Sequence, residues 1–313
     1  MQAPWALAID IGGTKLAVAR VRPDGEVFDR RQVPTPAGDG ETVWAALAGL
    51  VGSVAAPVEG SVEGSVEGCV GVGIGTAGPI DLGEGTVSPV NIGGWRRFPI
   101  VERVRSLVSG MPGVPVRLVG DGVAIALGER WRGAGQGCDD LVGMVVSTGV
   151  GGGLVLRGRP HVGPSGNAGH IGHISVDLEG PRCACGGIGC VEAIASGRSI
   201  AAWAASQGFT GGTDAAAVAA AAAAGDVVAL AAFDRAGRAI GSMLAGLATV
   251  CDVRVAVIGG GVANAGEVLF APIRSWLDRY AALPYASGLE LRRARLGGDA
   301  GLVGAASLLF DER

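Results

Sequence analysis

The chain has 313 residues, a length that suits about two domains, each large enough to bury its own core. Hydrophobic residues make up 49% and charged residues 17%, which excludes a disordered chain, and the formal net charge of −4 gives no electrostatic basis for binding nucleic acid. Six cysteines at this length do not indicate a disulfide scaffold, and the first eight residues lack the basic start of a signal peptide. We expect no membrane span and a reducing, cytoplasmic location.

The first predicted elements are two strands, 5–11 and 16–21, joined by a Gly-Gly turn. Glycines expose backbone N–H groups, and the adjoining hydroxyl and ammonium groups add donors and charge, which suits phosphate; the alternative is a plain hairpin turn. Asp10 precedes the turn and is suited to hold Mg²⁺ through water. The residues expected to contact phosphate are Gly12, Gly13, Thr14 and Lys15.

Helical spacing of apolar residues predicts a helix over 41–54. A short tandem repeat of Val-Glu-Gly-Ser units follows from Val58, which we interpret as a mobile surface loop because three copies of four residues are too few for a solenoid. A Gly/Val-rich strand is predicted over 69–76.

Another strand, 116–119, leads through Gly120 and Asp121 into a helix over 123–131. An Asp at such a junction is often only a helix N-cap, and that alternative stays open from the residues alone.

A second hairpin repeats the pattern of the first, with strands over 141–147 and 154–157 joined by Thr148-Gly-Val-Gly-Gly-Gly153. Two such hairpins, one in each half of the chain, indicate an internal duplication in which both turns grip a polyphosphate. The residues expected to contact phosphate here are Thr148, Gly149 and Gly151.

A dense cluster of metal-binding residue types lies in the stretch 166–192. Three thiols in a C-x-C-x4-C run and an imidazole just upstream make a Cys3His set that suits tetrahedral zinc, with no position left for a reactive water. We therefore predict a structural zinc site at His173, Cys183, Cys185 and Cys190. The alternative is a Gly-rich loop with unrelated thiols. The remaining cysteines, Cys69, Cys138 and Cys251, are interpreted as ordinary buried residues.

The last part of the chain alternates helices and strands. Helices are predicted over 191–206, 215–224, 226–251, 270–281 and 300–310, and strands over 253–258 and 289–296. The turn after the first of these strands, Gly259, Gly260 and Gly261, is suited to admit an adenine face or a ribose; the alternative is a crowded turn.

The chain resembles the ROK family (repressors, open reading frames and sugar kinases) in the motif Asp10-Ile-Gly-Gly-Thr-Lys15 and in Gly169-His170-Ile-Gly-His173 followed by Cys-x-Cys-Gly-x2-Gly-Cys-x-Glu192. The resemblance implies an α/β, two-domain actin-like ATPase (ribonuclease H-like) fold with a cleft between the domains and a zinc knuckle. The expected domains are residues 1–119 together with about 300–313, and residues 120–299.

The resemblance also implies site roles. Asp121 matches the family's catalytic base, and Asn91 stands where the family has an Asn near the sugar pocket. Gly120 stands in place of an Asn and His170 in place of a Glu, and in the family that Asn and that Glu bind sugar hydroxyls. We therefore expect this pocket to form a different set of hydrogen bonds with its sugar. The residues expected to bind or orient the sugar are Asn91, Gly120, Asp121, His170, His173 and Glu192.

The function that the resemblance implies is ATP-dependent phosphorylation of the 6-hydroxyl of a hexose: glucose, or an amino or N-acyl hexose such as glucosamine, 3-amino-glucose or N-acetylmannosamine. ATP, Mg²⁺ and a structural Zn²⁺ are the expected cofactors. The expected partners are the sugar and ATP, without nucleic acid or membrane, and a homodimer or dimer of dimers is usual in the family. The alternative is a non-catalytic sugar-binding sensor or regulator.

Overall fold

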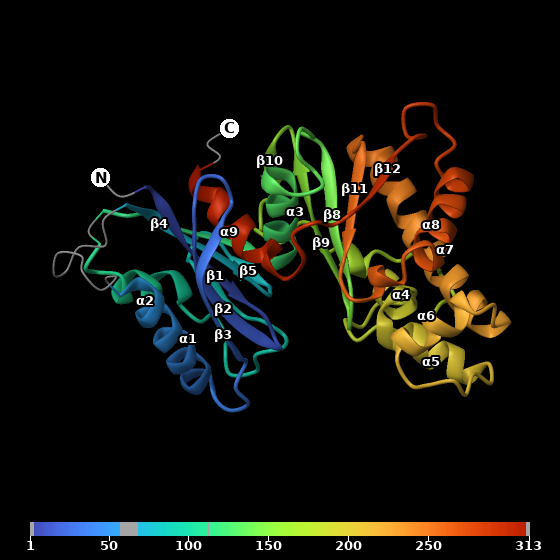
Figure 1. Ribbon diagram of the computed structural model, residues 1–313, viewed down its shortest axis with the longest axis horizontal. Helices are drawn as coiled ribbons and strands as arrows, with labels where there is room; N and C mark the ends of the chain where they lie inside the picture. Colours follow the sequence, from blue (N-terminus) through green and yellow to red (C-terminus); the bar gives the residue numbers. More distant parts are fainter. Residues whose placement is uncertain (1–2, 57–67, 112, 311–313) are drawn as a thin grey trace. The chain divides into compact units, whose positions relative to one another are not determined.

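The computed structural model describes residues 3–56, 68–111 and 113–310, so the Val-Glu-Gly-Ser repeat lies outside the described residues. The chain forms two compact units (Figure 1). The first contains Met1–Gln136, Pro160–Ala168 and Gly298–Arg313, and the second contains Gly137–Arg159 and Gly169–Gly297.

The first unit is built on a five-stranded sheet with the order β3-β2-β1-β4-β7. Its central strand β1 pairs antiparallel with β2 and parallel with β4, and β4 pairs parallel with β7. The predicted hairpin and strands of this half are confirmed. The strands are β1 (Trp5–Ile11), β2 (Lys15–Val21), β3 (Val27–Pro34), β4 (Cys69–Thr76) and β7 (Val116–Gly120), with β5 (Ile80–Asp81) and β6 (Thr86–Val87) in a separate pair.

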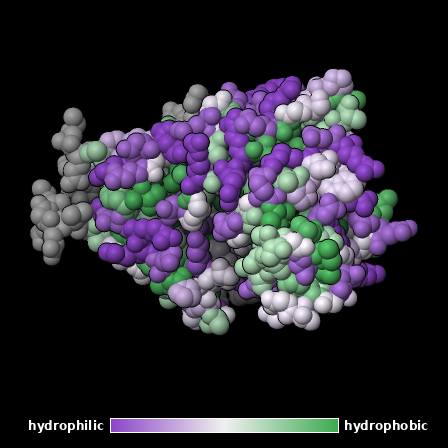
Figure 2. Space-filling view, turned by 45° about the vertical axis from the view of Figure 1, so that its right-hand side comes forward, coloured by the Kyte–Doolittle hydropathy of each residue, from purple (hydrophilic) through white to green (hydrophobic). Residues whose placement is uncertain are grey.

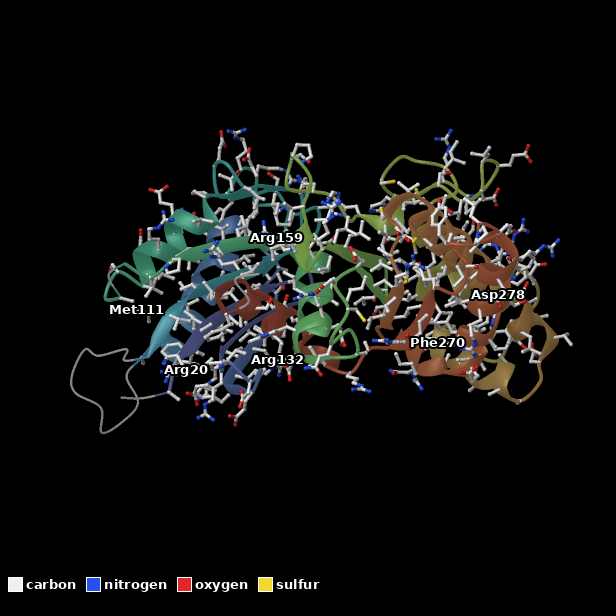
Figure 3. All side chains as sticks on the ribbon, turned by 90° about the horizontal axis from the view of Figure 1, so that it is seen from above. Arg20, Met111, Arg132, Arg159, Phe270 and Asp278 are labelled. Atoms are coloured by element: carbon white, nitrogen blue, oxygen red, sulfur yellow. The ribbon has the colours of Figure 1, made fainter. Side chains whose placement is uncertain are left out.

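Helices cover both faces of this sheet. Odd-numbered residues of β1, from Trp5 to Ile11, share a core with apolar residues of α1 and α2. On the other face α9 packs against β1 and β4 and also against α3. Arg20, labelled in Figure 3, extends from β2 and donates to the carbonyls of Val54 (2.9 Å) and Ala56 (2.6 Å). The helices are α1 (Gly40–Ala55), α2 (Ile100–Leu107), α3 (Asp121–Arg132) and α9 (Ala300–Phe310).

The second unit repeats this plan with a sheet of order β10-β9-β8-β11-β12. β8 and β9 form an antiparallel hairpin, whereas β8, β11 and β12 run parallel. The strands are β8 (Leu141–Val146), β9 (Val150–Leu156), β10 (Arg159–His161), β11 (Val255–Gly259) and β12 (Glu290–Arg293).

A helical layer packs on the second sheet, centred on the 25-residue helix α7. Glycines let α8 approach it, since a Cβ on Gly237 would lie 2.5 Å from Pro272. Figure 2 shows pale hydrophobic surface at the lower right, where Figure 1 places the Ala-rich α6. The helices are α4 (Val191–Ala195), α5 (Gly197–Ser206), α6 (Ala215–Ala223), α7 (Val227–Cys251) and α8 (Glu267–Tyr280), with short 3-10 turns η1 (Ile171–His173), η2 (Val262–Ala265) and η3 (Gly297–Asp299).

Four details differ from the sequence predictions. The helix predicted over 191–206 is two helices, because Ser196 leaves the helical conformation and its hydroxyl caps α5. Of the glycines expected in the second turn, Gly151, Gly152 and Gly153 lie in β9, where Gly152 makes room for Ile171 of η1. The first unit extends to Gln136, rather than ending at 119, because α3 packs against α9. Cys69, Cys138 and Cys251 are only partly buried, contrary to expectation.

Within the described residues, no single helix has the length and apolar character to cross a membrane; only α6 and α7 together, bent by 114° at their break, meet those criteria.

Candidate functional site

The parallel strands of the first unit bring three chain segments to one edge of the sheet. Register pairs Asp10 of β1 with Gly75 of β4, and Thr76 of β4 with Gly120 of β7. The carboxyl ends of parallel strands form a common edge, the usual place for ligands in α/β sheets. Asp10 and Asp121, far apart in sequence, therefore lie at the same edge.

Asp10 is an acidic group on an otherwise apolar strand face. Side chains alternate along a strand, so Asp10 shares the α9-facing side with the fully buried Ala6 and Ala8. Burial raises the pKa of Asp10 to about 6; Lys15 opposes this rise and Asp121 adds to it. A divalent cation beside the carboxylate would offset the cost of ionising it, so the residue fits the Mg²⁺ role predicted for it.

Asp121 is the first residue of α3, and the N-cap is Gly120, so the interpretation of Asp121 as an N-cap is wrong. Its Oδ1 instead accepts from the N–H of Gly122 at 2.7 Å. Burial raises the pKa of this carboxyl, with the hydrogen bond to Gly122 acting in the opposite direction. A desolvated carboxylate at a strand-to-helix junction suits a general base.

The first turn is held by hydrogen bonds from Thr35, the residue that follows β3. The Thr35 hydroxyl donates to the carbonyl of Gly12 at 2.7 Å, and its N–H donates to the carbonyl of Thr14 at 3.0 Å. Asn91 packs directly on the turn, since a Cβ on Gly13 would lie 2.4 Å from the Asn91 Cβ. The structure thus brings together the predicted phosphate turn and the predicted sugar residue Asn91.

Gly120 and Trp95, two residues close in sequence to predicted site residues, differ in the space around them. A Cβ on Gly120 would meet no atom within 4 Å, so the position beside Asp121 faces open space. Trp95, close to Asn91 in sequence, is fully buried against Phe98 and donates from Nε1 to the Gly40 carbonyl at 2.9 Å. It is a core residue.

In the second unit, the β8–β9 turn comprises only residues 147–149. The Ser147 N–H donates to the Gly149 carbonyl at 2.8 Å, and Arg198 Nε donates to the Thr148 carbonyl at 3.1 Å. Glu192 reaches the turn from α4, and its Oε2 accepts from the Val150 N–H at 2.9 Å. Thr148 and Gly149 lie in the turn as predicted, whereas Gly151 lies in β9.

A cavity of about 470 Å³ opens beside this turn at the carboxyl ends of β8 and β11. The glycine turn after β11 borders it through Gly261, while Gly260 adopts φ +93° and approaches the Val146 carbonyl so closely that no Cβ fits. Most residues of its lining lie outside the sequence motifs described above. These are Ser147, Gly197, Arg198, Ala201, Thr213, Asp214, Ala215, Ala216, Ala219, Val262, Asn264 and Ala265, which join Thr148 and Gly261.

The predicted metal ligands form one cluster, with their four donor atoms all within 4.8 Å of one another. Cys185 Sγ lies 3.7 Å from Cys190 Sγ, and Cys183 Sγ lies 3.7 Å from His173 Nδ1. Tetrahedral zinc with Zn–S bonds of about 2.3 Å separates its sulfur ligands by about 3.8 Å, so the donor set fits zinc. The Gly187 N–H points at Cys185 Sγ at 3.4 Å, a contact typical of thiolate ligands.

The thiol of Cys190 holds its proton strongly in the metal-free cluster. Burial raises its pKa to about 12, and hydrogen bonds with the Cys185 and Cys183 thiols, followed by charge repulsion from these sulfurs, add to the rise. His170, the residue in place of the family's Glu, lies near the cluster, with its ring 6.3 Å from that of His173. Burial, together with His173, lowers the pKa of His170, so its imidazole is neutral at about pH 7.

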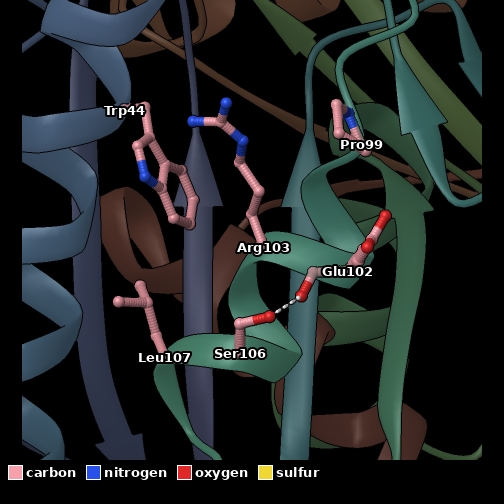
Figure 4. Close-up of a pocket in the computed structure, with 6 residues that line it drawn as sticks. All are labelled: Trp44, Pro99, Glu102, Arg103, Ser106 and Leu107. Carbon is pink, nitrogen blue, oxygen red and sulfur yellow. Dashed lines mark hydrogen bonds between the residues drawn. The ribbon is translucent and has the colours of Figure 1, made fainter.

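A second groove, of about 400 Å³, lies on the first unit between α1 and α2 (Figure 4). Its cationic group, Arg103, is paired with Glu41 through two hydrogen bonds of 2.7 Å and also lies over the ring of Phe98. These contacts explain the groove as part of the α1–α2 packing, and we do not place the active site there.

Comparison with known proteins identifies the family of the chain. The profile of the ROK family matches residues 6–312. The N-acetylmannosamine kinase of Escherichia fergusonii is 40% identical over 309 residues, which span 98% of this chain and 99% of that protein.

Solved structures share the fold over nearly the whole chain. A ROK family glucokinase from Streptomyces griseus, in complex with glucose and AMPPNP, has 34% identity and a TM-score of 0.79, covering 98% of this chain and 99% of its own. A ROK family transcriptional regulator, a homologue of the E. coli MLC protein, has 25% identity and a TM-score of 0.82, covering 98% of this chain and 78% of its own. The chain belongs to the ROK family and has the actin-like ATPase fold of its sugar kinases.

Proposed function

We propose that this protein is an ATP-dependent sugar kinase that transfers the γ-phosphoryl group to the 6-hydroxyl of a hexose. The observation that carries the proposal is the meeting of two partly buried, desolvated carboxylates, Asp10 and Asp121, at the carboxyl ends of β1 and β7. Phosphoryl transfer needs positioning, charge neutralisation and a base; Asp10 would hold the Mg²⁺ that neutralises charge, and Asp121 would be the base.

In this mechanism Asp121 accepts the proton of the sugar hydroxyl as that oxygen attacks the γ-phosphorus and the bond to the β-phosphate oxygen breaks. The raised pKa of Asp121 makes it a stronger base once it is ionised. Lys15, which tempers the rise in the pKa of Asp10, places a positive charge beside the phosphates. Mg²⁺, which Asp10 would hold through water, supplies further charge neutralisation when bound.

The nucleotide is assigned to the second unit. The cavity of about 470 Å³ is of the size that holds a small ligand, and its small apolar residues suit the face of a purine. Thr213, Asp214 and Asn264 offer polar groups to the base or ribose, and the Thr148 turn leads from the cavity toward the phosphates. Arg198 adds an exposed positive charge at the same turn.

The knuckle is assigned to structural zinc held by His173, Cys183, Cys185 and Cys190. Four protein donors fill a tetrahedral site, so the metal ties the loop to the start of α4 and takes no part in phosphoryl transfer. We therefore assign His173 to the metal through Nδ1, which faces Cys183 at 3.7 Å.

For the sugar, we propose an N-acyl hexosamine such as N-acetylmannosamine ahead of glucose. Gly120 leaves open space beside Asp121, where a side chain would otherwise occupy room needed by an acyl group. The neutral His170 can donate one hydrogen bond and accept one, which suits an amide better than it suits a pair of hydroxyls. A 40% identical relative named N-acetylmannosamine kinase supports the same class.

A sugar-binding regulator without catalysis is the second candidate, favoured by the likeness to a ROK family transcriptional regulator. The two desolvated carboxylates weigh against it, because sugar binding alone gives no reason to hold Asp10 with a pKa of about 6.

The test is a coupled assay of ADP release from Mg·ATP with glucose, mannose, fructose, glucosamine, 3-amino-glucose, N-acetylglucosamine and N-acetylmannosamine. The proposal expects the largest kcat/KM for N-acetylmannosamine, with phosphorus NMR placing the phosphate on C6. Tight sugar binding in calorimetry without turnover on any of these sugars would instead favour the regulator.

A further inference from the structure

Glu192 occupies an unusual place between two parts of the second unit. It is the second residue of α4, whose N-cap is the cluster residue Cys190. Its carboxylate does not point back to the knuckle but accepts from the Val150 N–H at 2.9 Å, at the point where the β8–β9 turn enters β9. One side chain thus connects the start of α4 to the predicted phosphate turn.

The approach of this carboxylate depends on Gly149. A Cβ on Gly149 would lie 2.5 Å from Glu192 Oε2, so any other residue would push the carboxylate away. Gly149 has no left-handed backbone conformation to explain its presence, whereas the carboxylate contact does.

The backbone around Glu192 is fixed on both sides. The Val191 N–H donates to the Ile174 carbonyl at 3.0 Å, and the Ser199 hydroxyl donates to the Glu192 carbonyl at 3.1 Å. The knuckle segment and α5 therefore hold the backbone from which the carboxylate extends, and the carboxylate adds one hydrogen bond to a turn that Gly197 and Arg198 also contact.

We propose that Glu192 is a positioning residue for the nucleotide: Oε2 orders the Thr148–Gly149 turn through Val150, while Oε1 is left to accept from the sugar. Occupation of the sugar site would then fix the carboxylate, and with it the turn that receives the phosphates. The inference rests on the proposed kinase function and adds to it a route by which sugar binding tightens nucleotide binding. It requires no movement beyond the side chain.

Two substitutions separate this role from a simple charge. Glu192→Asp keeps the charge but shortens the reach, so the hydrogen bond to Val150 is lost. Glu192→Gln keeps the reach and the acceptor oxygen but removes the charge. Gly149→Ala leaves Glu192 intact and displaces its carboxylate. Glu179→Asp, an exposed position on the knuckle segment, is the matched control.

The first measurement is hydrogen exchange at the Val150 amide in the ligand-free proteins, and the second is the Kd of Mg·AMPPNP with and without N-acetylmannosamine or glucose. We expect Glu192→Asp and Gly149→Ala to speed exchange and to raise the Kd about tenfold, the loss typical of one charge-assisted hydrogen bond. Glu192→Gln keeps a neutral hydrogen bond and should raise the Kd only about threefold without sugar, whereas Glu179→Asp should stay within about twofold of wild type. The tightening by sugar should disappear in Glu192→Asp.

Unchanged Val150 exchange in Glu192→Asp would overturn the inference and leave the kinase proposal standing. An equal rise of the Kd in Glu192→Asp and Glu192→Gln would also overturn it, because charge rather than reach would then matter. If the wild type neither binds AMPPNP nor releases ADP with any sugar, the kinase proposal fails and the coupling fails with it, even where Val150 exchange responds as expected.

Discussion

The carboxylate of Asp10 lies against the first turn of α9, so closely that a Cβ on Gly301 would stand 2.9 Å from its Cγ. Asp10 belongs to the first strand of the chain and Gly301 to the last helix. The C-terminal helix therefore forms one wall of the acidic site, and the peptide N–H groups at its start favour a negative charge there. Burial outweighs that help, as the raised pKa of Asp10 shows.

This contact predicts the effect of Gly301→Ala. The new methyl group would displace the Asp10 carboxylate, and we expect kcat to fall by at least about tenfold, because small misplacements of catalytic groups are costly. The matched control is Gly246→Ala in α7, where a Cβ meets nothing within 4 Å, and it should keep wild-type kcat. Steady-state kinetics of both variants check the prediction; equal kcat values would contradict it.

Asp10 also predicts a dependence of stability on pH. Its folded pKa of about 6 exceeds the ordinary value of 3.8, so ionisation disfavours the folded state. Below pH 3.8 Asp10 is protonated in both the folded and the unfolded state, so it does not destabilise the fold. The destabilisation grows as pH rises from the ordinary pKa of 3.8 to the folded pKa of about 6. Without ligands, Asp10→Asn should therefore stabilise the protein by about 3 kcal/mol at pH 8 but by only about half of that at pH 5. Urea unfolding at the two pH values measures the difference, and a gain that is equal at both would count against burial as the cause.

Asp121 predicts the acid limb of the rate profile. A general base must be ionised, and burial raises the pKa of Asp121, so activity is full above that raised pKa and declines as pH falls through it. We expect kcat/KM to decline at a higher pH than an exposed aspartate would give. Values of kcat/KM from about pH 4.5 to 9, with enzyme stability checked at each point, test this prediction. It would be contradicted if kcat/KM declined only at or below the pH at which an ordinary, exposed carboxyl group becomes protonated.

The Cys3His cluster predicts one bound zinc ion per chain. Removal of the zinc should lower the thermal stability of the protein. It should also raise the Kd of Mg·AMPPNP, because α4 begins at the cluster and carries Glu192 to the β8–β9 turn. Metal analysis of wild type and Cys183→Ser measures the content. Cys251→Ser, at the end of α7 and outside the cluster, should retain full zinc. Cys183→Ser with unchanged zinc content and melting temperature would show that the cluster is not the site.

Much of the fold could be predicted from local patterns. The hairpin of β1 and β2 follows from two apolar runs around a Gly-Gly pair, and the knuckle from the tight spacing of its thiols. The glycines of β9 were misplaced because a run of glycine reads as a turn, whereas Gly152 is small in order to receive Ile171 from a distant segment. Such packing has no local signal.

The residues of the site could also be predicted only in part from local sequence patterns. Asp10 and Asp121 could be named from their motifs, but their proximity depends on parallel pairing through β4. Arg198, Thr213 and Asn264 were missed because the cavity is assembled from separate segments whose side chains carry no motif of their own. The contact of Glu192 with Val150 joins residues 42 positions apart and was likewise beyond local patterns.

The most direct test of the central claim compares wild type with Asp121→Asn on the best sugar of the panel. The account predicts that kcat for ADP release falls by about a hundredfold or more in the variant, as expected for loss of a general base, while sugar affinity by calorimetry changes little. Turnover that survives the substitution at the wild-type rate would contradict the assignment of Asp121 as the base.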